Sequence, residues 1–337
     1  MYKFQKKLEL NKFQGVKFNM VNGVAYFSNG DIAVLDALNS RVCIFDKEGK
    51  EIHNFGKKGF RDNEFHNPVS IAINSNNEIY VADWMNHAIK IFTKKGKFIF
   101  SYGKYGKPKE KFKIFNRLKK IRSCMISNKN SKFRFINKNI NFLKYLLYQI
   151  KKHKGIISFF RYIQSNKDIF YKPDGFAFKD NEVFISQHFQ NTICIFDPKE
   201  KKIRKKIGNP YTDTKFNKPS NLCFDRKKNL YVSDSFNYCV RVFDQNLIEN
   251  ESIIGKYSLK KYFFPFGIKE IEQDILVICG MELIQFYNVK NSEVIYSFQD
   301  GFNQLHGLDY ISIGNKKFNL LLADRLNHRA IIYQIEK

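Results

Sequence analysis

The residues most capable of chemistry in this chain are acidic and amide side chains that recur at a fixed spacing. The pairs are Asp36 and Asn39, Asp83 and Asn86, Asp234 and Asn237, and Asp324 and Asn327. Repeated carboxylates could act as acids or metal ligands, but short polar side chains at turns also accept hydrogen bonds from backbone N–H groups one to three residues ahead. In a further copy Gln187 takes the place of the Asp, and an amide carries no charge. We therefore expect these residues to be structural turns.

Enzyme signatures are missing from the sequence. It has no G-x-S-x-G elbow, no Walker glycine-lysine loop and no H-E-x-x-H zinc motif. The glycines of YGKYG at 102–106 lack the spacing of a dinucleotide-binding loop. We therefore predict that the protein is not an enzyme and that it binds no cofactor.

The Asp-x-x-Asn pattern belongs to a longer repeat. Similar stretches are VLDALNSRVCIF at 34–45, VADWMNHAIKIF at 81–92, VSDSFNYCVRVF at 232–243 and LADRLNHRAIIY at 322–333. Several copies open with an aromatic residue, two further residues and a proline, and the openings at Pro173, Pro219 and Pro265 are 46 residues apart. A regular period of this length indicates an array of similar structural units.

Each unit contains four short runs in which apolar and polar residues alternate. In one unit the runs are SIAIN at 70–74, EIYVAD at 78–83, AIKIF at 88–92 and FIFSYG at 98–103. An Asn-rich connector joins the first two runs and the Asp turn follows, which is a hairpin signal. Four strands in about 45 residues describe one blade of a β-propeller.

The pattern D-x-x-N-H-x-I-x-x-F, with its aromatic-x-x-Pro opening, resembles the NHL repeat. Asn86-His87 and Asn327-His328-Arg329 reproduce the turn that names the repeat, so His87 and His328 are expected to be turn residues. The likeness covers most of the chain except part of 104–169. It implies an all-β fold in which residues 1–337 form a single closed propeller of four-stranded blades around a central channel.

The two ends of the chain are expected to complete one blade. The last unit stops after its third strand, RAIIYQIE at 329–336, and YKFQKKLEL near the N-terminus alternates like a strand. We expect this N-terminal strand to close the last blade, because the pairing would remove two open sheet edges.

The sequence leaves two interpretations of the number of blades. Six units are visible, although the unit at 265–298 has Gly280 and Met281 where the Asp turn should be. In the favoured interpretation, residues 104–169 hold a degenerate third blade, because Phe133 and Phe135 fall at strand positions, and the propeller has seven blades. In the alternative, 104–169 is a basic insertion on a six-bladed propeller.

Most of the positive charge lies in one segment. The chain carries a formal net charge of +26, and residues 104–167 hold 19 Lys and Arg against one acid, so the rest carries only +8. Cations interleaved with apolar residues suit RNA or an acidic membrane surface, and a solvated lysine-rich loop is the alternative. The resemblance allows RNA binding, since several NHL propellers of the tripartite-motif relatives bind RNA on a basic face. The candidate RNA-binding residues are Lys107, Lys109, Lys111, Lys113, Arg117, Lys119, Lys120 and Arg122.

His306 and Asp174 are weak candidates for a metal or small-ligand site. Each lies one place after the start of its unit, where the chain would enter the innermost strand at the channel mouth. The resemblance extends to the amidating lyases, whose propeller brings several histidines to the channel to hold zinc. Zinc needs three or four convergent ligands, so we predict no metal here. A metal-dependent lyase-like or lactonase-like enzyme remains the second alternative function.

The Asp turns and the loops that enter the innermost strands are expected to share one face. Exposed aromatic residues beside arginines suit protein interfaces and stacked bases. The candidate partner-binding residues on this face are Arg41, Trp84, His188, Phe236, Tyr238, Arg325 and Arg329. We predict a non-catalytic scaffold that binds a protein partner through this face, with RNA binding as the first alternative.

The remaining composition indicates an intracellular protein with a substantial core. The chain is 43% hydrophobic, yet no apolar run is long enough to span a membrane and the N-terminus lacks a signal peptide. The six cysteines show no metal-like spacing, and Cys43 and Cys194 occupy the same strand position in two units. We expect a cytoplasmic, monomeric protein without a transmembrane segment, whose cysteines are small buried strand residues.

Overall fold

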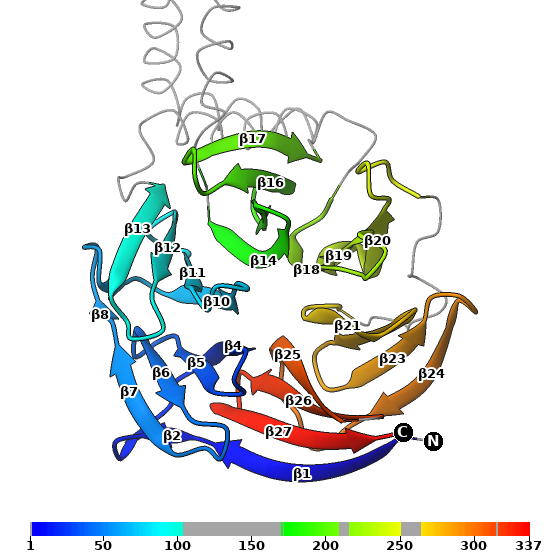
Figure 1. The fold of residues 1–337 in the computed structure, drawn as a ribbon, viewed down its shortest axis with the longest axis horizontal. Helices are drawn as coiled ribbons and strands as arrows, with labels where there is room; N and C mark the ends of the chain where they lie inside the picture. Colours follow the sequence, from blue (N-terminus) through cyan, green and yellow to red (C-terminus); the bar gives the residue numbers. More distant parts are fainter. Residues whose placement is uncertain (1, 104–169, 171, 209–215, 251–263, 315) are drawn as a thin grey trace, which may run out of the picture. The chain divides into compact units, whose positions relative to one another are not determined.

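Alternating apolar residues and polar turns give the chain a succession of short antiparallel strands. The computed structural model describes residues 2–103, 170, 172–208, 216–250, 264–314 and 316–337. Their main strands form six sheets, and each sheet is one blade of a β-propeller. Figure 1 shows the blades arranged around a common centre, with β4, β10, β14, β18, β21 and β25 innermost.

The blades follow one another in chain order. Blade one contains β4 (Val21–Tyr26), β5 (Ile32–Asp36), β6 (Arg41–Phe45) and β7 (Glu51–Phe55). Blade two contains β10 (Pro68–Ile73), β11 (Ile79–Asp83), β12 (Ala88–Phe92) and β13 (Phe98–Gly103). Blade three contains β14 (Pro173–Lys179), β15 (Glu182–Gln187), β16 (Thr192–Asp197) and β17 (Lys202–Ile207).

Blades four and five continue this order, and blade six draws on both ends of the chain. Blade four contains β18 (Pro219–Phe224), β19 (Leu230–Asp234) and β20 (Cys239–Phe243), with the short helix η1 (Ser235–Asn237) between the last two. Blade five contains β21 (Ile268–Glu272), β22 (Ile275–Cys279), β23 (Ile284–Asn288) and β24 (Glu293–Phe298). Blade six contains β25 (Leu305–Gly314), β26 (Lys317–Asp324), β27 (Arg329–Glu336) and β1 (Lys3–Leu10). Short pairs join β2 (Lys12–Phe13) to β3 (Val16–Lys17), and β8 (Lys57–Lys58) to β9 (Glu64–Phe65).

The hydrophobic core lies between the blades. Six clusters of buried side chains are present in the described residues, and each joins two neighbouring blades. One of them packs blade six against blade one. Cys43 and Cys194 belong to these clusters and have no exposed surface, as the sequence predicts. Each sheet is therefore covered on both faces by its neighbours, so its second and third strands are buried almost throughout instead of alternating between core and solvent.

The aromatic residue that opens a unit packs inside its own blade. Phe65 lies three residues before Pro68, and its ring centre is 5.5 Å from that of Phe92 at the end of the third strand. The same contact joins Phe170 to Phe196 at 5.8 Å, Phe216 to Phe243 at 5.9 Å, and Phe302 to Tyr333 at 6.0 Å. Such a pair contributes about 0.5–1.5 kcal/mol beyond the burial of its area. The opening aromatic of the repeat is therefore a core residue.

The N-terminal strand completes the last blade. β1 pairs antiparallel with β27, with Lys3 opposite Glu336 and Leu10 opposite Ala330. Its side chains extend the core, because the ring of Phe4 stacks on Phe298 at 4.2 Å. The expected pairing of residues 1–10 with the last unit is therefore present. Figure 1 shows β1 as the outermost strand beside β27.

The described residues favour six blades over the preferred expectation of seven. β10 of blade two contacts β14 of blade three directly. Tyr80 and Ile89 of blade two share one buried cluster with Phe176 and Cys194 of blade three. The degenerate blade expected in 104–169 falls outside the described residues, and the two blades that flank this segment in the chain pack on each other.

Among the described residues, no helix is long and apolar enough to cross a membrane. The helical structure labelled in them is the three-residue η1. This part of the chain is therefore essentially all strand and turn.

Deleting residues 1–10 should lower the stability of the protein, since it removes β1 and the ring of Phe4 from the core. We expect a loss of at least about 3 kcal/mol in the free energy of unfolding, the cost of removing one packed Phe side chain. Thermal and urea unfolding would measure it. Lys3→Ala removes only an exposed side chain of the same strand and serves as the control. An unchanged melting temperature in the truncated protein would contradict the role assigned to β1.

Candidate functional site

The Asp turns all lie at one end of the blades, because each joins the second strand of its blade to the third. In blade one, Asp36 ends the second strand and pairs both with Val21 at the start of the innermost strand and with Arg41. In blade five the equivalent position is Cys279, which pairs with Ile284. We call the six turns, together with the loops that enter the innermost strands, the turn face.

Each turn Asp is buried and holds its turn to the loop that enters the blade. Oδ1 of Asp36 accepts a hydrogen bond from the N–H of Asn19 at 2.7 Å, and Oδ2 accepts one from the amide of Asn39 at 2.8 Å. The same two bonds recur at Asp83, Asp234 and Asp324. The backbone donor thus comes from a loop 17 residues before Asp36, whereas the sequence suggested a donor just ahead of it.

A cation from the third strand faces each of these carboxylates. Arg41 Nε lies 2.8 Å from Asp36, Lys90 Nζ 2.9 Å from Asp83 and Arg329 Nε 2.8 Å from Asp324. The side chains of Arg41 and Arg329 are only 12% and 18% exposed. These two candidate partner-binding residues therefore contact the turns of their own blades.

The fifth residue of the turn links one blade to the next. Nδ1 of His328 in blade six accepts the N–H of Met20 in blade one at 2.9 Å. Nδ1 of His87 in blade two lies 3.3 Å from the N–H of Lys172 in blade three. Oδ1 of Asn191 in blade three accepts the N–H of Lys218, at the entrance to blade four, at 3.0 Å. The histidines of the repeat are therefore turn residues, as expected, and they also bridge blades.

Two histidines, an aspartate and an arginine meet at the channel mouth. Asp174 follows the opening proline of blade three and lies 3.6 Å from Nδ1 of His188. His306 has the equivalent position in blade six, where Nδ1 contacts the carbonyl of Asn22 at 2.9 Å. Arg325 follows the turn Asp of blade six and donates to Gln304 at 3.2 Å. The mouth thus brings together polar side chains of blades three and six.

Several polar atoms of the mouth have no hydrogen-bond partner among the described residues. They are Oδ1 of Asp174, Nδ1 of His188, Nε of Arg325 and Oδ1 of Asn22, and all of them are buried. Buried polar atoms are normally paired because an unpaired one loses its bonds to water. Four such atoms around one opening are suited to binding the polar groups of a ligand.

Burial controls the protonation of the mouth. It raises the pKa of Asp174 to about 7, against a weaker lowering by the charge of Arg325. It lowers the pKa of His188 to about 4 and that of His306 to about 3. Both imidazoles are therefore neutral near pH 7, while the carboxyl group of Asp174 is close to half ionised. The mouth can both donate and accept hydrogen bonds without a large net charge.

Aromatic side chains continue from the mouth across blades two, three and four. Ring centres are 5.5 Å apart for Trp84 and Phe189, 6.2 Å for His188 and Phe236, 5.5 Å for Phe236 and Phe264, and 4.7 Å for Tyr238 and Phe264. We call these six residues the aromatic ledge. Lys172 Nζ lies 3.7 Å from the ring centre of Trp84, and Lys218 Nζ lies 3.6 Å from that of Phe236. The ledge therefore combines apolar area with positive charge.

A second apolar feature recurs at the third position of all six turns. We call these residues the apolar crown: Leu38, Met85, Phe189, Phe236, Met281 and Leu326. Five of them are exposed, from 36% for Met85 to 47% for Leu38, and Phe236 is partly buried in the ledge. Large apolar side chains that are exposed to water add no stability to a propeller. Their recurrence on one face is typical of an interaction surface.

The sequence anticipated this face but not its most exposed residues. Trp84, His188, Phe236 and Tyr238 do meet in the ledge, and Arg325 lies at the mouth. Apart from Phe236 the crown was missed, although the turns D-A-L-N, D-W-M-N, Q-H-F-Q, D-S-F-N, C-G-M-E and D-R-L-N show an apolar third residue throughout. The candidate RNA-binding residues between Lys107 and Arg122 lie outside the described residues.

Within the part of the chain that the structure describes, no group of three or more His, Cys, Asp and Glu side chains is placed to hold a metal ion. The weak candidates His306 and Asp174 belong to the mouth, where each lies beside neutral or cationic partners.

The fold and its turns define the chain as a β-propeller. The family model of the NHL repeat matches residues 18–45 and 65–92, so blades one and two carry NHL repeats. No curated protein matches the sequence significantly.

Solved propellers resemble the chain along its whole length. Virginiamycin B lyase from Staphylococcus aureus superimposes with a TM-score of 0.56 and 12% identity, covering 100% of both chains. The WD40 propeller domain of Doa1 gives a TM-score of 0.56 at 9% identity, over 99% of this chain and 97% of that one. A streptogramin B lyase gives 0.54 at 10% identity, with the same coverage. At these identities the similarity concerns the fold alone.

Replacing Asp36 by Ala should destabilise blade one, because it removes the carboxylate that the N–H of Asn19, the amide of Asn39 and the guanidinium of Arg41 share. We expect a loss of at least about 2 kcal/mol in the free energy of unfolding. Urea unfolding would measure it. Asp46→Ala is the matched control, since Asp46 also accepts two backbone N–H groups but in a solvent-exposed turn. Equal losses in the two variants would contradict the assignment.

Replacing Asp174 by Asn should stabilise the protein in a pH-dependent way. The folded protein keeps a proton on Asp174 up to pH about 7, whereas the unfolded chain loses it near 3.8. Wild-type stability therefore falls as the pH rises through that window, at up to about 1.4 kcal/mol per pH unit. Asn has no proton to lose.

The two proteins should therefore be about equally stable below pH 4. Above pH 7, Asp174→Asn should be more stable by at least about 1 kcal/mol. Unfolding measured across this range tests the prediction, and Asp180→Asn, at an exposed position of the same blade, is the control. A difference that does not change with pH would contradict it.

Proposed function

We propose that this propeller is a non-catalytic scaffold that binds a protein partner through its turn face. The apolar crown is the observation that carries the proposal. The fold requires the turn Asp and Asn, because both are hydrogen-bonded inside the blade. It does not require the crown, whose side chains point away from the core, so their apolar character is best explained by contact with another molecule.

The aromatic ledge indicates where binding is strongest. Aromatic side chains that are already packed against one another lose little conformational freedom on binding, and aromatic residues dominate the energy of interfaces. The 46% exposure of Phe189 makes it the most accessible ring of the ledge. Lys172 and Lys218 add positive charge over the same rings. A partner segment with apolar side chains next to Asp or Glu would match this combination.

A six-bladed propeller with 104–169 as an insertion is the architecture we propose for the scaffold. Support comes from the direct packing of blade two on blade three and from the shared cluster between blades six and one. The turn face then carries one crown residue for each blade.

Small-ligand binding at the channel mouth is a second candidate function. The unpaired buried atoms of Asp174, His188 and Arg325 favour it. Two of the similar propellers are lyases, and one was solved as an inactive variant with quinupristin. A lyase-like reaction in this chain would use the neutral imidazoles and the carboxyl group of Asp174 for proton transfer.

Substitutions in the crown should weaken partner binding strongly and leave the stability of the propeller unchanged. A photo-crosslinking residue at position 189 should capture one protein in cells, and the same residue at position 99 on the outer strand β13 should not. Binding of the captured protein, purified, should then weaken at least about 100-fold in the triple variant Met85→Ser, Phe189→Ser, Leu326→Ser, since interface anchors contribute 2 kcal/mol or more each.

The matched control replaces three equally exposed apolar residues of outer strands, Ile52, Ile99 and Ile295, by Ser. It should bind as the wild type does. Equal affinity in the two triple variants would reject the turn face as the binding site. Crosslinking to RNA, with affinity that falls steeply with salt, would replace the protein partner by the RNA alternative.

A further inference from the structure

The central channel contains a cavity that is separate from the mouth. It has a volume of about 350 Å³ and is lined by the innermost strands of all six blades. At the end nearer the turn face it is lined by Gly23, Ser70, Asn221 and Gly307, which have small or short side chains. We call these four residues the narrow layer. Asp174 and His306 of the mouth do not line the cavity. From this layer it extends toward Asp225 and Tyr310, at the end of the blades opposite the turn face.

Close approach of the backbones creates the narrow layer. A Cβ atom on Gly307 would lie 3.1 Å from Cα of Gly23 in the next blade, and one on Gly175 would lie 2.6 Å from the carbonyl of Ser220. Glycine is needed where two backbones come this close. Asn221 also spans the layer, because its amide lies 3.3 Å from the carbonyl of His306. The cavity and the mouth are therefore two sites with different linings.

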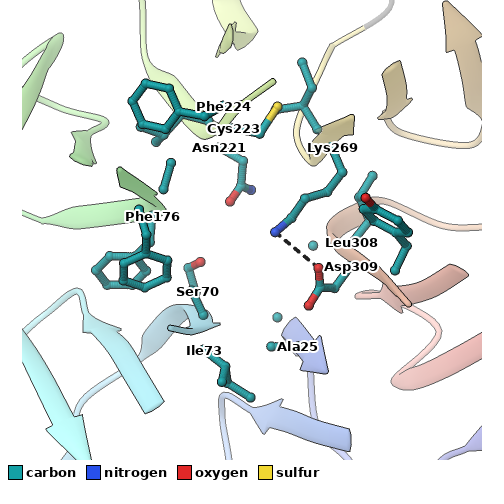
Figure 2. A pocket seen from close by; sticks show the side chains of 18 of the residues that line it. Ala25, Ser70, Ile73, Phe176, Asn221, Cys223, Phe224, Lys269, Leu308 and Asp309 are labelled. Carbon is teal, nitrogen blue, oxygen red and sulfur yellow. Dashed lines mark ion pairs between the residues drawn. The ribbon is translucent and has the colours of Figure 1, made fainter. Parts of the chain in front are cut away.

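One ion pair projects into the cavity from its wall. Figure 2 shows Lys269 and Asp309 directed toward each other in the open space, with Ser70 and Asn221 across from them. Lys269 Nζ lies 3.2 Å from Oδ1 of Asp309, whose Oδ2 accepts the N–H of Tyr26. The side chain of Lys269 is 35% exposed and that of Asp309 is 18% exposed, so both can meet a ligand.

The other charged lining residues are already engaged. The carboxylate of Glu270 accepts the N–H of Arg226 at 2.8 Å, and that of Asp225 accepts the N–H of Asn229 at 2.7 Å. Burial lowers the pKa of Lys269, but Asp309, Cys223 and Tyr310 together raise it by more, so the pKa lies above its usual value and the ammonium stays charged. The cavity therefore presents one cation and one anion side by side, and this pair has no net charge.

This arrangement limits the chemistry of a ligand. A ligand with a single charge would bind one of these two side chains and place a like charge beside the other in a partly buried space, which is costly. A ligand with adjacent positive and negative groups can place its anion against Lys269 and its cation against Asp309. It leaves the net charge of the site unchanged and adds two charge-assisted hydrogen bonds. Ser70 and Asn221 add polar side chains to the lining at the narrow layer (Figure 2).

Part of the remaining wall of the cavity is apolar. Phe176, Phe178 and Phe224 line it on blades three and four, with Leu308 beside the ion pair and Ile73 on blade two. Figure 2 shows the rings of Phe176 and Phe224 across the cavity from Lys269. An apolar group that enters this part of the cavity would be removed from water, at a gain of about 25 cal/mol per Å² of apolar surface buried.

We propose that the cavity binds a free apolar α-amino acid, with its carboxylate on Lys269, its ammonium on Asp309 and its side chain against the phenyl rings. The volume is within the range of small-molecule sites, about 300–1,000 Å³. The site lies at the opposite end of the blades from the turn face, so it does not depend on the proposed protein-binding function. It would make the propeller responsive to a metabolite.

Binding of L-leucine and L-phenylalanine to the full-length protein tests the proposal. At millimolar concentration at least one of them should raise the melting temperature, and calorimetry should give a saturable heat. The matched probes are the same molecules without the ammonium group, 4-methylpentanoate and 3-phenylpropanoate, and without the carboxylate, 3-methylbutylamine and 2-phenylethylamine. Each probe should bind at least about tenfold more weakly, a difference of 1.4 kcal/mol.

Two variants assign the binding to the cavity. Asp309→Asn keeps an acceptor for the N–H of Tyr26 and should weaken amino-acid binding at least about tenfold without unfolding the protein. Lys227→Met removes a cation outside the cavity lining and should leave affinity unchanged. The proposal is overturned if neither amino acid binds, if the single-charge probes bind as well, or if Asp309→Asn binds normally. Binding of glucose in place of both amino acids would assign the cavity to polyols instead and would equally overturn it.

Discussion

The buried carboxylate of the turn Asp is the interaction on which the architecture depends. In four blades it accepts two hydrogen bonds, one from a backbone N–H of the loop that enters the blade and one from the amide of the Asn three residues later. It also forms an ion pair with a cation of the third strand. Without it, the turn, the innermost strand and the entering loop would have no common anchor. A buried carboxylate is tolerable only because every such partner is present.

The blades that lack this Asp show how far the constraint can be relaxed. Blade three has Gln187, which contacts Thr192 and Cys194 inside the blade. Blade five has Cys279, a small apolar residue that packs in the cluster between blades five and six. Both blades keep the register of the second and third strands. Packing between sheets therefore maintains the blade, while the Asp holds the loop that enters its innermost strand.

Much of the fold could be predicted from the sequence because its signals are local and repeated. Alternating strands, the Asp turns and the opening aromatics all recur with one period, and the strand at residues 1–10 could be paired because the last unit was one strand short. The number of blades was harder, because it depends on contacts between residues far apart in the chain, such as Tyr80 with Phe176. The partial burial of Arg41 and Arg329 could not be predicted either, since their partners are fixed by strand register. The Lys269–Asp309 pair joins two blades that no local pattern relates.

The pairing of β1 with β27 also affects how the chain reaches its final form. Lys3 is synthesised long before its partner Glu336, so β1 has no strand to pair with until β27 has been made. During synthesis the blades from one to five can pack in order, while β1 remains an unpaired edge with Phe4 and Leu8 exposed. Long-range pairing of this kind slows folding and leaves an edge open to other chains. A propeller whose last blade pairs such distant strands is therefore vulnerable to aggregation until β27 has left the ribosome.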